Sequence, residues 1–341
     1  MTRPGVKVCM PSYNSGATIA ESLGSVLAQD YPELEVVVVD NASTDGTAAV
    51  ARGFAEKDPR VRVEVNPRNL GAEGNFTRCL ELGGGDYTAI YHADDIYEPG
   101  MLSAAVAFLE KEPSAGAVFT SADEIDGYGR VIGRRRPPPE LGDCRDGKAF
   151  GFDEIFRAVL RNGNFLTFPT ALVRTAVYRD EIKAWNGEKY KSSADLDVWL
   201  RIAEKHRVGF IDRPLLRYRV STVSFSYSHF RLRTQRQDLF LVLEDYVARH
   251  GARLGRAALD DYRLLQLKDD ISIAINHVIQ GERRAALSRL TGIFGPRNFI
   301  QSFRSRAQLR ILAIGWAAFL AALLPLGEAG RKALARARHK G

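Results

Sequence analysis

From residue 6 to about residue 121, short runs of β-branched residues alternate with segments of helical periodicity. This alternation is the sequence pattern of parallel βαβ units, and it constrains the fold more than any other feature of the chain. The run Leu34–Asp40 (LEVVVVD) is nearly continuous in valine, as expected for a central strand that is buried on both faces. We therefore expect an α/β protein with a doubly wound sheet flanked by helices.

The same pattern predicts where the elements lie. We expect strands at Val6–Met10, Leu34–Asp40, Val61–Val65, Tyr87–Tyr91 and Ala117–Thr120, and helices near residues 47–57, 75–82 and 100–112. A further helix is expected to open at Thr18, because Thr18 and Glu21 have the spacing of a capping box.

The second half of the chain is less regular. Residues 126–146 include glycines, the basic run Arg134–Arg136 and three prolines, which predict a turn and an extended loop. We expect the basic run to be solvated or to contact an anionic acceptor or lipid. Beyond this loop the pattern predicts helices near residues 153–161 and 197–205, strands Val208–Ile211 and Leu215–Val220, and a helical region over residues 229–290.

The net charge of +7 is concentrated near the C-terminus. Residues 301–341 contain eight Lys or Arg and one Glu, so the other 300 residues carry no net charge. A nucleic-acid-binding protein needs a basic face on its folded body, so we expect no nucleic acid partner. The amino end has no apolar run of signal-peptide length, and three widely spaced cysteines (Cys9, Cys79 and Cys144) predict free thiols. These features together indicate a cytoplasmic protein.

The basic C-terminal segment contains one apolar run, Ile311–Leu324. Its 14 residues would rise only about 21 Å as a helix, which is less than the roughly 30 Å of a bilayer's hydrocarbon core. Because Arg310 and Arg331-Lys332 flank it, we expect a helix lying on an anionic membrane, at the inner face of the cell membrane. Packing on the protein body or in a dimer contact is the alternative. We predict an α/β domain at 1–225, a helical extension at 226–300 and a membrane-associating tail at 301–341.

Polar residues follow four of the predicted strands, at the edge where open α/β sheets bind ligands. The four segments are Pro11–Asn14, Asp40–Gly46, Asn66–Gly71 and His92–Asp95. An aromatic ring, an arginine and several carboxylates would therefore meet at one edge. Carboxylates accommodate phosphate only with a divalent cation between them, so we expect a nucleoside diphosphate with Mg²⁺ or Mn²⁺.

In this order and spacing, the motifs resemble those of the family 2 glycosyltransferases, which have the GT-A fold. The matching motifs are strand-PxYN, VVVVD-N-x-S-x-D-x-T, N-x-G and an acidic pair at a strand end. The stretch Asn69–Phe76 leading to Tyr91–Asp95 is similar to the bacterial branch of the family. The resemblance covers about Val6–Val220, and it implies a GT-A domain that binds a nucleotide sugar, with uridine or deoxythymidine donors (UDP- or dTDP-sugars) favoured.

The resemblance also implies roles for single residues around the nucleotide. Pro11 and Tyr13 would contact the base and Asp40 would accept a hydrogen bond from it. Arg68 would hold the base or its phosphate. Three asparagines would shape the loops at this site, namely Asn14, Asn41 and Asn69.

The acidic pair is implied to bind the metal. Asp94 would bind ribose or the ion, and Asp95 would be the principal protein ligand of the metal. His92 stands where the family has its first acidic residue. We expect its imidazole to hydrogen-bond the backbone rather than to bind the metal.

A second acidic segment, Ser193–Arg201, resembles the family motif E-D-x-D-x-W-x-R, with Ala194 in place of the glutamate. The resemblance implies that Asp195 is the catalytic general base and Asp197 a helix cap. Inverting transfer needs one such carboxylate, which takes the proton of the acceptor hydroxyl as that oxygen attacks the sugar.

Two positions near the end of the matching region bear on the same site. Ser221 stands where relatives often have a metal-binding histidine, and the nearest later candidate, His229, is expected to be a surface residue. Arg217 or Arg219 would neutralise the leaving diphosphate or form salt bridges on the strand surface.

The sequence thus predicts an inverting, metal-dependent glycosyltransferase of the hexosyltransferase type. Its acceptor would be a glycan or a lipid-linked hydroxyl in cell-surface polysaccharide or glycolipid assembly. One alternative is a catalytically inactive nucleotide-binding scaffold at the membrane. The other is a sugar-nucleotide pyrophosphorylase, which should carry basic residues in its first loop, whereas Pro11–Gly16 has none.

Overall fold

The computed structural model describes residues 3–220, 233–294, 306–324 and 327–339, with only the backbone for 306–308 and 336–339. The chain divides into two units, one of Met1–Ser221 with Leu241–Asp245 and one of Thr222–Phe240 with Tyr246–Gly341. Ser221, His229 and the predicted boundaries at residues 225 and 300 lie outside the described residues.

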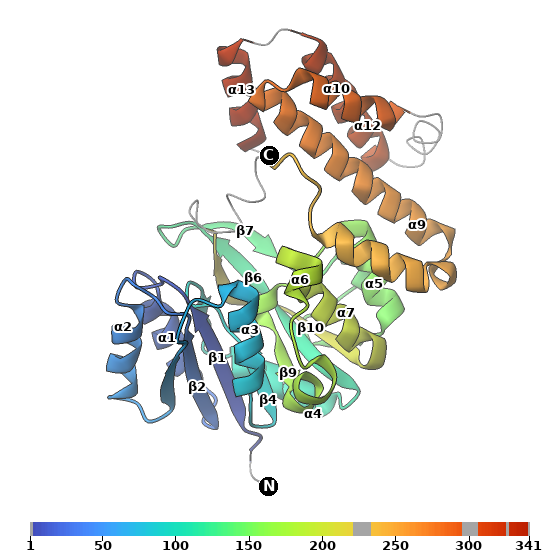
Figure 1. Ribbon diagram of the computed structural model, residues 1–341. Coiled ribbons are helices and arrows are strands. Elements are labelled where there is room, and N and C mark those ends of the chain that lie inside the picture. The colour runs from blue at the N-terminus through green and yellow to red at the C-terminus, as the bar shows by residue number, and fades with distance from the viewer. Residues whose placement is uncertain (1–2, 221–232, 295–305, 325–326, 340–341) are drawn as a thin grey trace. The chain divides into compact units, whose positions relative to one another are not determined.

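The first unit is built on one sheet, in which the described residues form ten strands. Eight of them follow the order β3 (Val61–Val65), β2 (Leu34–Asp40), β1 (Val6–Ser12), β4 (Tyr87–Ile90), β9 (Leu172–Arg174), β6 (Ala115–Ile125), β10 (Arg207–Arg219) and β5 (Ile96–Tyr97). β7 (Val131–Arg135) pairs with β6, and β8 (Lys148–Phe150) pairs with β10. The first four strands are mutually parallel, whereas β9 is antiparallel to both of its neighbours. The sheet is therefore mixed, and the predicted fold class is confirmed (Figure 1).

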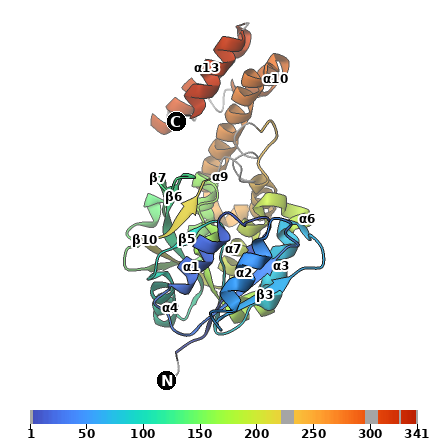
Figure 2. The same ribbon diagram turned by 90° about the vertical axis from the view of Figure 1, so that its left-hand side faces the viewer.

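Helices cover both faces of this sheet (Figures 1 and 2). α1 (Ile19–Leu27), α2 (Thr47–Ala55) and α4 (Met101–Lys111) share one core with Val36 and Val38 of β2. α3 (Gly71–Leu82) contacts β1 and β2, while α5 (Phe152–Asn162) and α7 (Ala194–Lys205) contact β10. Val37 and Val39 are also buried, and side chains alternate between the faces of a strand, which explains the run of valines in β2.

Two expectations about strands were wrong. The segment expected to be an extended loop contains β7, which pairs with β6 in an antiparallel hairpin. There Arg134 pairs with Asp123 at 2.6 Å and Arg135 with Glu124 at 2.8 Å, so cross-strand charge pairs stabilise a strand that lacks an apolar pattern. The two strands expected at residues 208–211 and 215–220 are one strand, β10, with bulges around Pro214. Proline lacks the N–H of a regular ladder, and a bulge accommodates it without ending the strand.

The capping box expected at Thr18 does not form. Thr18 Oγ1 donates to the carbonyl oxygen of Ala93 at 2.8 Å, and Glu21 accepts a hydrogen bond from Arg219 at 2.6 Å. α1 has no side-chain hydrogen bond at its N-cap. Both side chains therefore bind partners that are distant in sequence, and their local spacing carried no information about those partners.

The second unit is helical. Its helices are α9 (Leu239–Gln280), which also supplies Leu241–Asp245 to the first unit, α10 (Arg283–Thr291), α12 (Arg306–Leu323) and α13 (Glu328–His339). A core of its own joins Ile271 and Val278 of α9 with Leu290 of α10 and Ala318 and Ala322 of α12. Over its described part, the helical region predicted at residues 229–290 is thus confirmed by α9 and α10. Within the described ranges, no helix is both long and apolar enough to cross a membrane.

Two short helices complete the part of the first unit that the structure describes. A π-helix covers Val177–Ile182, and α6 covers Gly187–Tyr190. Between them lies Trp185, which is buried. Short 3-10 turns occur at Pro139–Leu141, Phe168–Thr170 and Lys191–Ser193, and another lies in the second unit at Gly292–Phe294. Of the aromatic side chains described below, Trp185 lies in this region between β9 and α7, and Phe168 lies in the 3-10 turn before β9.

Candidate active site

The loops that follow β1 and β2 are joined by hydrogen bonds. Asn14 has a left-handed backbone, with a φ of 49°, and its N–H donates to Ser43 Oγ at 2.9 Å. Its side-chain oxygen accepts the N–H of Thr44 at 2.9 Å. Gly16 likewise donates its N–H to Asp45 Oδ2 at 2.9 Å. The two strand ends therefore form one continuous rim.

Two of the predicted base contacts lie on this rim. Pro11 is half-buried within β1, and Tyr13, just after the strand, is 48% exposed. An exposed aromatic ring beside a rigid loop is a surface on which a planar base can stack. The roles of both residues toward a base stay predictions.

Asp40 at the end of β2 is fully buried. Its Oδ2 accepts the N–H of Ser43 at 3.0 Å, and its Oδ1 accepts the hydroxyl of Ser12 at 3.4 Å. In the described structure this carboxylate holds the loop after β2. A hydrogen bond from Asp40 to a base stays a prediction.

A network of asparagines fixes the loop after β3. Asn41 donates to Asn69 Oδ1 at 2.9 Å, and its own side-chain oxygen accepts from Asn66 at 3.0 Å and from the N–H of Leu70 at 2.9 Å. Asn66 also donates to Asn75 at 2.9 Å. Asn66 and Asn75 are buried members that the motif analysis did not single out, although both lie within the quoted stretches.

Arg68 lies in the loop that this network holds. Its side chain is exposed, and no ion-pair partner for it is found among the described residues. A guanidinium in this state is available to a phosphate group. That observation is compatible with the predicted role of Arg68.

The turn after β4 carries the acidic pair. Asp95 is 1% exposed, and its Oδ1 accepts the backbone N–H of Arg219 at 2.8 Å. The guanidinium of Arg219 donates to the carbonyl oxygen of Asp94 at 2.8 Å and also bonds Glu21. The turn is held from the other side by the hydroxyl of Thr18. β10 and α1 thus fix the position of both aspartates.

This turn has the donor set of a divalent metal site. Ligand atoms of His92, Asp94 and Asp95 all lie within 4.8 Å of one another. Asp95 Oδ2 and His92 Nε2 are buried, and neither has a hydrogen-bond partner among the described residues. Buried polar atoms are normally paired, so these two fit a site that a cation completes.

The electrostatics of the turn fit the same interpretation. Burial raises the pKa of Asp95 well above its ordinary value, and the charge of Asp94 adds to this effect. Burial lowers the pKa of His92, against the opposing charge of Asp94, and so favours the neutral imidazole, which is the form that binds metal. The expectation that His92 bonds the backbone was wrong for the described residues, because its ring instead contacts Phe76, Phe168 and, at 3.8 Å, Asp95 Oδ2.

Arg217 and Arg219 both form ion pairs. Salt bridges were one of the two predictions for these arginines, the other being contact with the leaving diphosphate. Arg217 pairs with Glu98 at 2.7 Å and Arg219 with Glu21 at 2.6 Å. Arg219 nevertheless belongs to the site, because it holds the acidic turn through its backbone and its side chain.

Asp195 lies in the first turn of α7. The side-chain amide of Asn164, which follows α5, donates to Asp195 Oδ2 at 3.1 Å. Burial raises the pKa of Asp195 to about 6, against the lowering effects of hydrogen bonds from Leu196 and Asn164. A carboxylate with this pKa is charged at neutral pH and still basic enough to accept a proton from a substrate.

Asp197, two residues further on, lies inside α7, whose N-cap is Ser193, so the expectation that it caps the helix was wrong. Its role is structural in another way. It is buried and forms an ion pair with Arg201 at 2.9 Å. It also accepts a hydrogen bond from Asn186 at 2.8 Å, and Arg201 donates to the carbonyl oxygens of Ile182 and Ala184. Asp197 thus fixes the segment around Trp185.

A cluster of aromatic rings connects the acidic turn with α7. The ring of Phe168 lies 5.0 Å from that of His92 and 5.6 Å from that of Trp199 on α7. Phe76 and Trp185 also contact Phe168, with ring centroids 5.1 and 5.0 Å away. The turn that carries Asp95 and the helix that carries Asp195 therefore pack on the same side chains.

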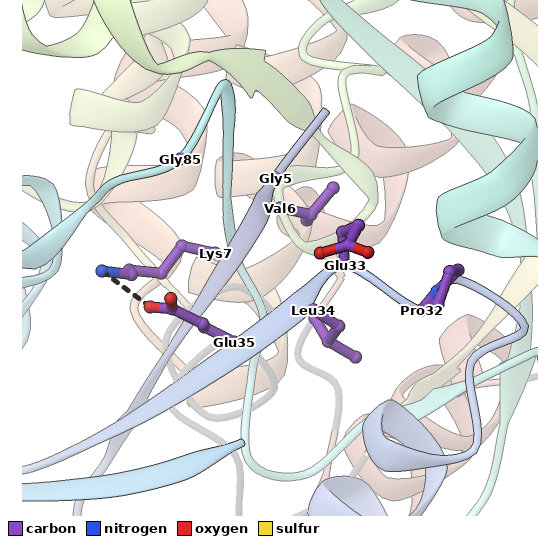
Figure 3. Close-up of a pocket in the computed structure, with 8 residues that line it drawn as sticks. All are labelled: Gly5, Val6, Lys7, Pro32, Glu33, Leu34, Glu35 and Gly85. Carbon is purple, nitrogen blue, oxygen red and sulfur yellow. Dashed lines mark ion pairs between the residues drawn. The ribbon is translucent and has the colours of Figure 1, made fainter. Parts of the chain in front are cut away.

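A separate pocket lies at the other edge of the sheet (Figure 3). It is lined by residues 5–7, 32–35 and 85, at the amino ends of β1 and β2. Its charged groups include Lys7 and Glu35, which neutralise each other across 3.0 Å. The predicted site residues lie instead at the carboxyl ends of the strands, so this pocket does not belong to the site.

The mixed sheet and its flanking helices define a protein of the GT-A fold. The sequence model described as "Glycosyl transferase family 2" matches residues 7–181. The chain therefore belongs to glycosyl transferase family 2, as its motifs predicted.

Individual relatives agree with this assignment. TuaG of Bacillus subtilis, named for teichuronic acid biosynthesis, is 33% identical over 230 residues, which cover 67% of this chain and 84% of TuaG. The structure of S. aureus TarS 1-349 in complex with UDP-GlcNAc matches 98% of this chain and 88% of its own, with a TM-score of 0.55 and 19% identity. The mannosyltransferase PcManGT from Pyrobaculum calidifontis, in complex with GDP-Man and Mn²⁺, matches 100% of this chain and 87% of its own, with a TM-score of 0.54 and 21% identity. These structures are similar to this chain in fold.

Sequence reasoning missed Asn164 because it follows α5, 31 positions before Asp195 and outside every motif. The role of Arg219 in holding the acidic turn was also missed. The only sequence signal for either is a polar residue at the end of an element, which is too common to be informative.

Proposed function

We propose that this protein is an inverting glycosyltransferase that moves a sugar from a nucleoside diphosphate sugar to an acceptor hydroxyl, with Asp195 as the general base. The observation that carries the proposal is the shared aromatic cluster, in which Phe168 contacts both His92 of the acidic turn and Trp199 of the Asp195 helix. A site of this kind has donor-binding groups on one side and a base on the other.

In the proposed reaction, the acceptor hydroxyl lies against Asp195. The carboxylate takes the hydroxyl proton while the oxygen attacks the anomeric carbon, opposite to the leaving diphosphate. Asn164 holds one carboxylate oxygen, and we assign the other to the acceptor hydroxyl. This arrangement forms one glycosidic bond and breaks one sugar–phosphate bond.

The nucleotide would lie along the rim formed by the first three parallel strands. We assign base stacking to Tyr13 with Pro11, hydrogen bonding to Asp40, and phosphate or base contact to Arg68. Asn14 and Asn69 hold the loops in which these residues lie. Asp94 would bind ribose or the ion.

We assign a Mg²⁺ or Mn²⁺ site to Asp95, with Asp94 and His92 beside it. When bound there, the cation would neutralise charge on the leaving diphosphate. The buried, unpartnered Asp95 Oδ2 supports this assignment. PcManGT, which has a similar fold, was solved with Mn²⁺.

The relatives support the proposed substrate classes. TuaG is named for teichuronic acid biosynthesis and TarS was solved with UDP-GlcNAc, so we propose a UDP-sugar donor, or a dTDP-sugar as the motifs also allow, and a glycan or lipid-linked acceptor. We place the reaction in the cytoplasm, a reducing compartment in which the three buried thiols would stay free.

A thermal-shift screen of nucleotide sugars with Mn²⁺ tests the donor. A ligand that binds only the folded protein raises its melting temperature. We expect a rise of several degrees with one class of donor, followed by release of its nucleoside diphosphate when an acceptor is added. Binding without any release or transfer would instead indicate the inactive scaffold.

A further inference from the structure

α12 in the second unit has two different faces. On the buried face, Ala318 and Ala322 pack in the core of this unit, and Leu312 is also buried. Gly315 lies on the same face, where a Cβ atom would come within 3.2 Å of Ile271 on α9. This close packing fixes which side of α12 faces outward.

The outward face of α12 is apolar. We define the lipid face as the exposed large apolar residues of this segment, Leu309, Ile314, Trp316, Leu320, Leu323 and Leu324. They account for six of the thirteen exposed large apolar residues that the described part of the chain contains. A contiguous apolar surface of this kind marks a binding site for a protein or a membrane.

Charge distinguishes between these occupants. Residues 301–341 carry eight Lys or Arg and one Glu, whereas the rest of the chain has no net charge. Arg310 is exposed beside the lipid face, and no acidic partner for it lies within the described segments. A second copy would bring two such cationic segments together, whereas an anionic lipid surface complements them.

The length of α12 decides how it would meet a bilayer. The helix covers Arg306–Leu323, and no described helix is long and apolar enough to cross a membrane. A helix with one apolar face and flanking cations lies flat in the headgroup region. We propose that the lipid face of α12 binds the surface of membranes that contain anionic lipids. This inference does not depend on the proposed catalytic activity.

Cosedimentation of the full chain with vesicles tests the proposal. Vesicles of phosphatidylcholine alone are compared with vesicles in which about a third of the lipid is phosphatidylglycerol. We expect binding to the anionic vesicles to exceed binding to the neutral ones at least tenfold, and to weaken as salt is raised. Equal binding to both compositions, or none to either, would overturn the proposal.

A matched pair of substitutions tests the face itself. Leu320 is 57% exposed on α12, and Ile132 is 58% exposed on β7 of the first unit. Leu320→Glu should weaken vesicle binding at least tenfold because it adds an anion to the inserted face, whereas Ile132→Glu should leave binding unchanged. Arg310→Ala should weaken binding about fivefold. Equal effects of the two Glu substitutions would contradict the proposal.

Tryptophan emission provides an independent measurement. Of the three tryptophans, Trp316 is 46% exposed, whereas Trp185 and Trp199 are 8% and 1% exposed. Anionic vesicles should shift the emission to shorter wavelength, and Trp316→Phe should remove that shift. Light scattering on the same samples tests whether a second copy covers the lipid face instead. If the protein does not bind vesicles but forms a dimer that Leu320→Glu dissociates, the face belongs to a second copy and the proposal is overturned.

Discussion

The side-chain amide of Asn164 donates a hydrogen bond to Oδ2 of Asp195 at 3.1 Å. Asn164 is itself held, because its side-chain oxygen accepts the N–H of Leu166 at 3.1 Å. This bond stabilises the charged form of Asp195, while burial stabilises the neutral form and prevails, so that the pKa is raised to about 6. Asn164 is therefore a positioning residue for the proposed base.

Asn164→Ala should change the pH dependence of transfer. Loss of the donated hydrogen bond raises the pKa of Asp195 further, so the acid limb of the pH–rate profile should move to higher pH. Activity at pH 6.5 should fall several-fold and recover at higher pH. Asn162→Ala is the matched control, because Asn162 lies at the end of α5 and bonds Ala158 and Glu140 instead. An unshifted profile in Asn164→Ala would show that the bond has no influence on the base.

Asp195→Asn should stabilise the fold above neutral pH. The pKa of Asp195 is about 6 in the folded state against 3.8 for the free side chain, so its stability contribution is present below pH 3.8 and is lost as pH rises through 6. Asparagine avoids that loss. We expect a gain of about 1–2 kcal/mol at pH 8, less than the full pKa shift implies because Asp195 is only half-buried. The gain should grow between pH 4 and 6 and then level off.

An Asp-to-Asn substitution two residues away, at Asp197, should lower the stability of the fold instead of raising it. Asp197→Asn removes one partner of the buried ion pair with Arg201 and should destabilise the fold by about 3 kcal/mol. Thermal or urea denaturation of both variants at pH 5 and pH 8 measures the two effects. Destabilisation by Asp195→Asn at pH 8 would show that burial does not raise the pKa of Asp195.

Removal of the metal should abolish transfer. We expect EDTA to stop the reaction and Mn²⁺ or Mg²⁺ to restore it. Asp95→Asn should lose the rise in melting temperature that Mn²⁺ gives together with a nucleoside diphosphate. Asp143→Asn is a control, because Asp143 is an exposed carboxylate paired with Arg145. Full activity in EDTA would contradict the role assigned to Asp95.

Arg68→Ala should weaken nucleotide binding. A charge-assisted hydrogen bond contributes about 1.5–3 kcal/mol, so we expect the Kd of the nucleoside diphosphate to rise about tenfold or more. Arg62→Ala is matched to it, because Arg62 is exposed on β3 and pairs with Glu64 at 3.3 Å. Isothermal titration calorimetry measures both variants, and an equal Kd in the two would exclude Arg68 from the nucleotide site.

The sheet could be predicted because its signals are local. The valines of β2 occupy both faces of one strand, so a continuous run of apolar residues in the sequence predicts a strand buried on both faces. β7 was missed for the opposite reason, since Arg134 and Arg135 are stabilised by partners on β6 rather than by an apolar pattern. Two strands were predicted in place of β10 because a proline inside a strand, here Pro214, usually ends it.

The site was predictable only where a motif placed residues at strand ends. The acidic pair was found in this way, and the structure brings His92, Asp94 and Asp95 together. The environment of His92 could not be predicted, because Phe168, which contacts its ring, lies 76 positions away in the sequence. Asn164 was missed and Thr18 was wrongly predicted to cap α1, in both cases because their hydrogen-bond partners are distant in the chain.

The most direct measurement compares donor binding and transfer in the wild type and in Asp195→Asn. With the donor found by the nucleotide-sugar screen, the variant should bind with a Kd within about threefold of the wild type, while transfer falls by about a thousandfold. The anomeric configuration of the wild-type product, measured by NMR, should be inverted relative to the donor. Transfer by Asp195→Asn at the wild-type rate, or a product that retains the donor's configuration, would contradict the account.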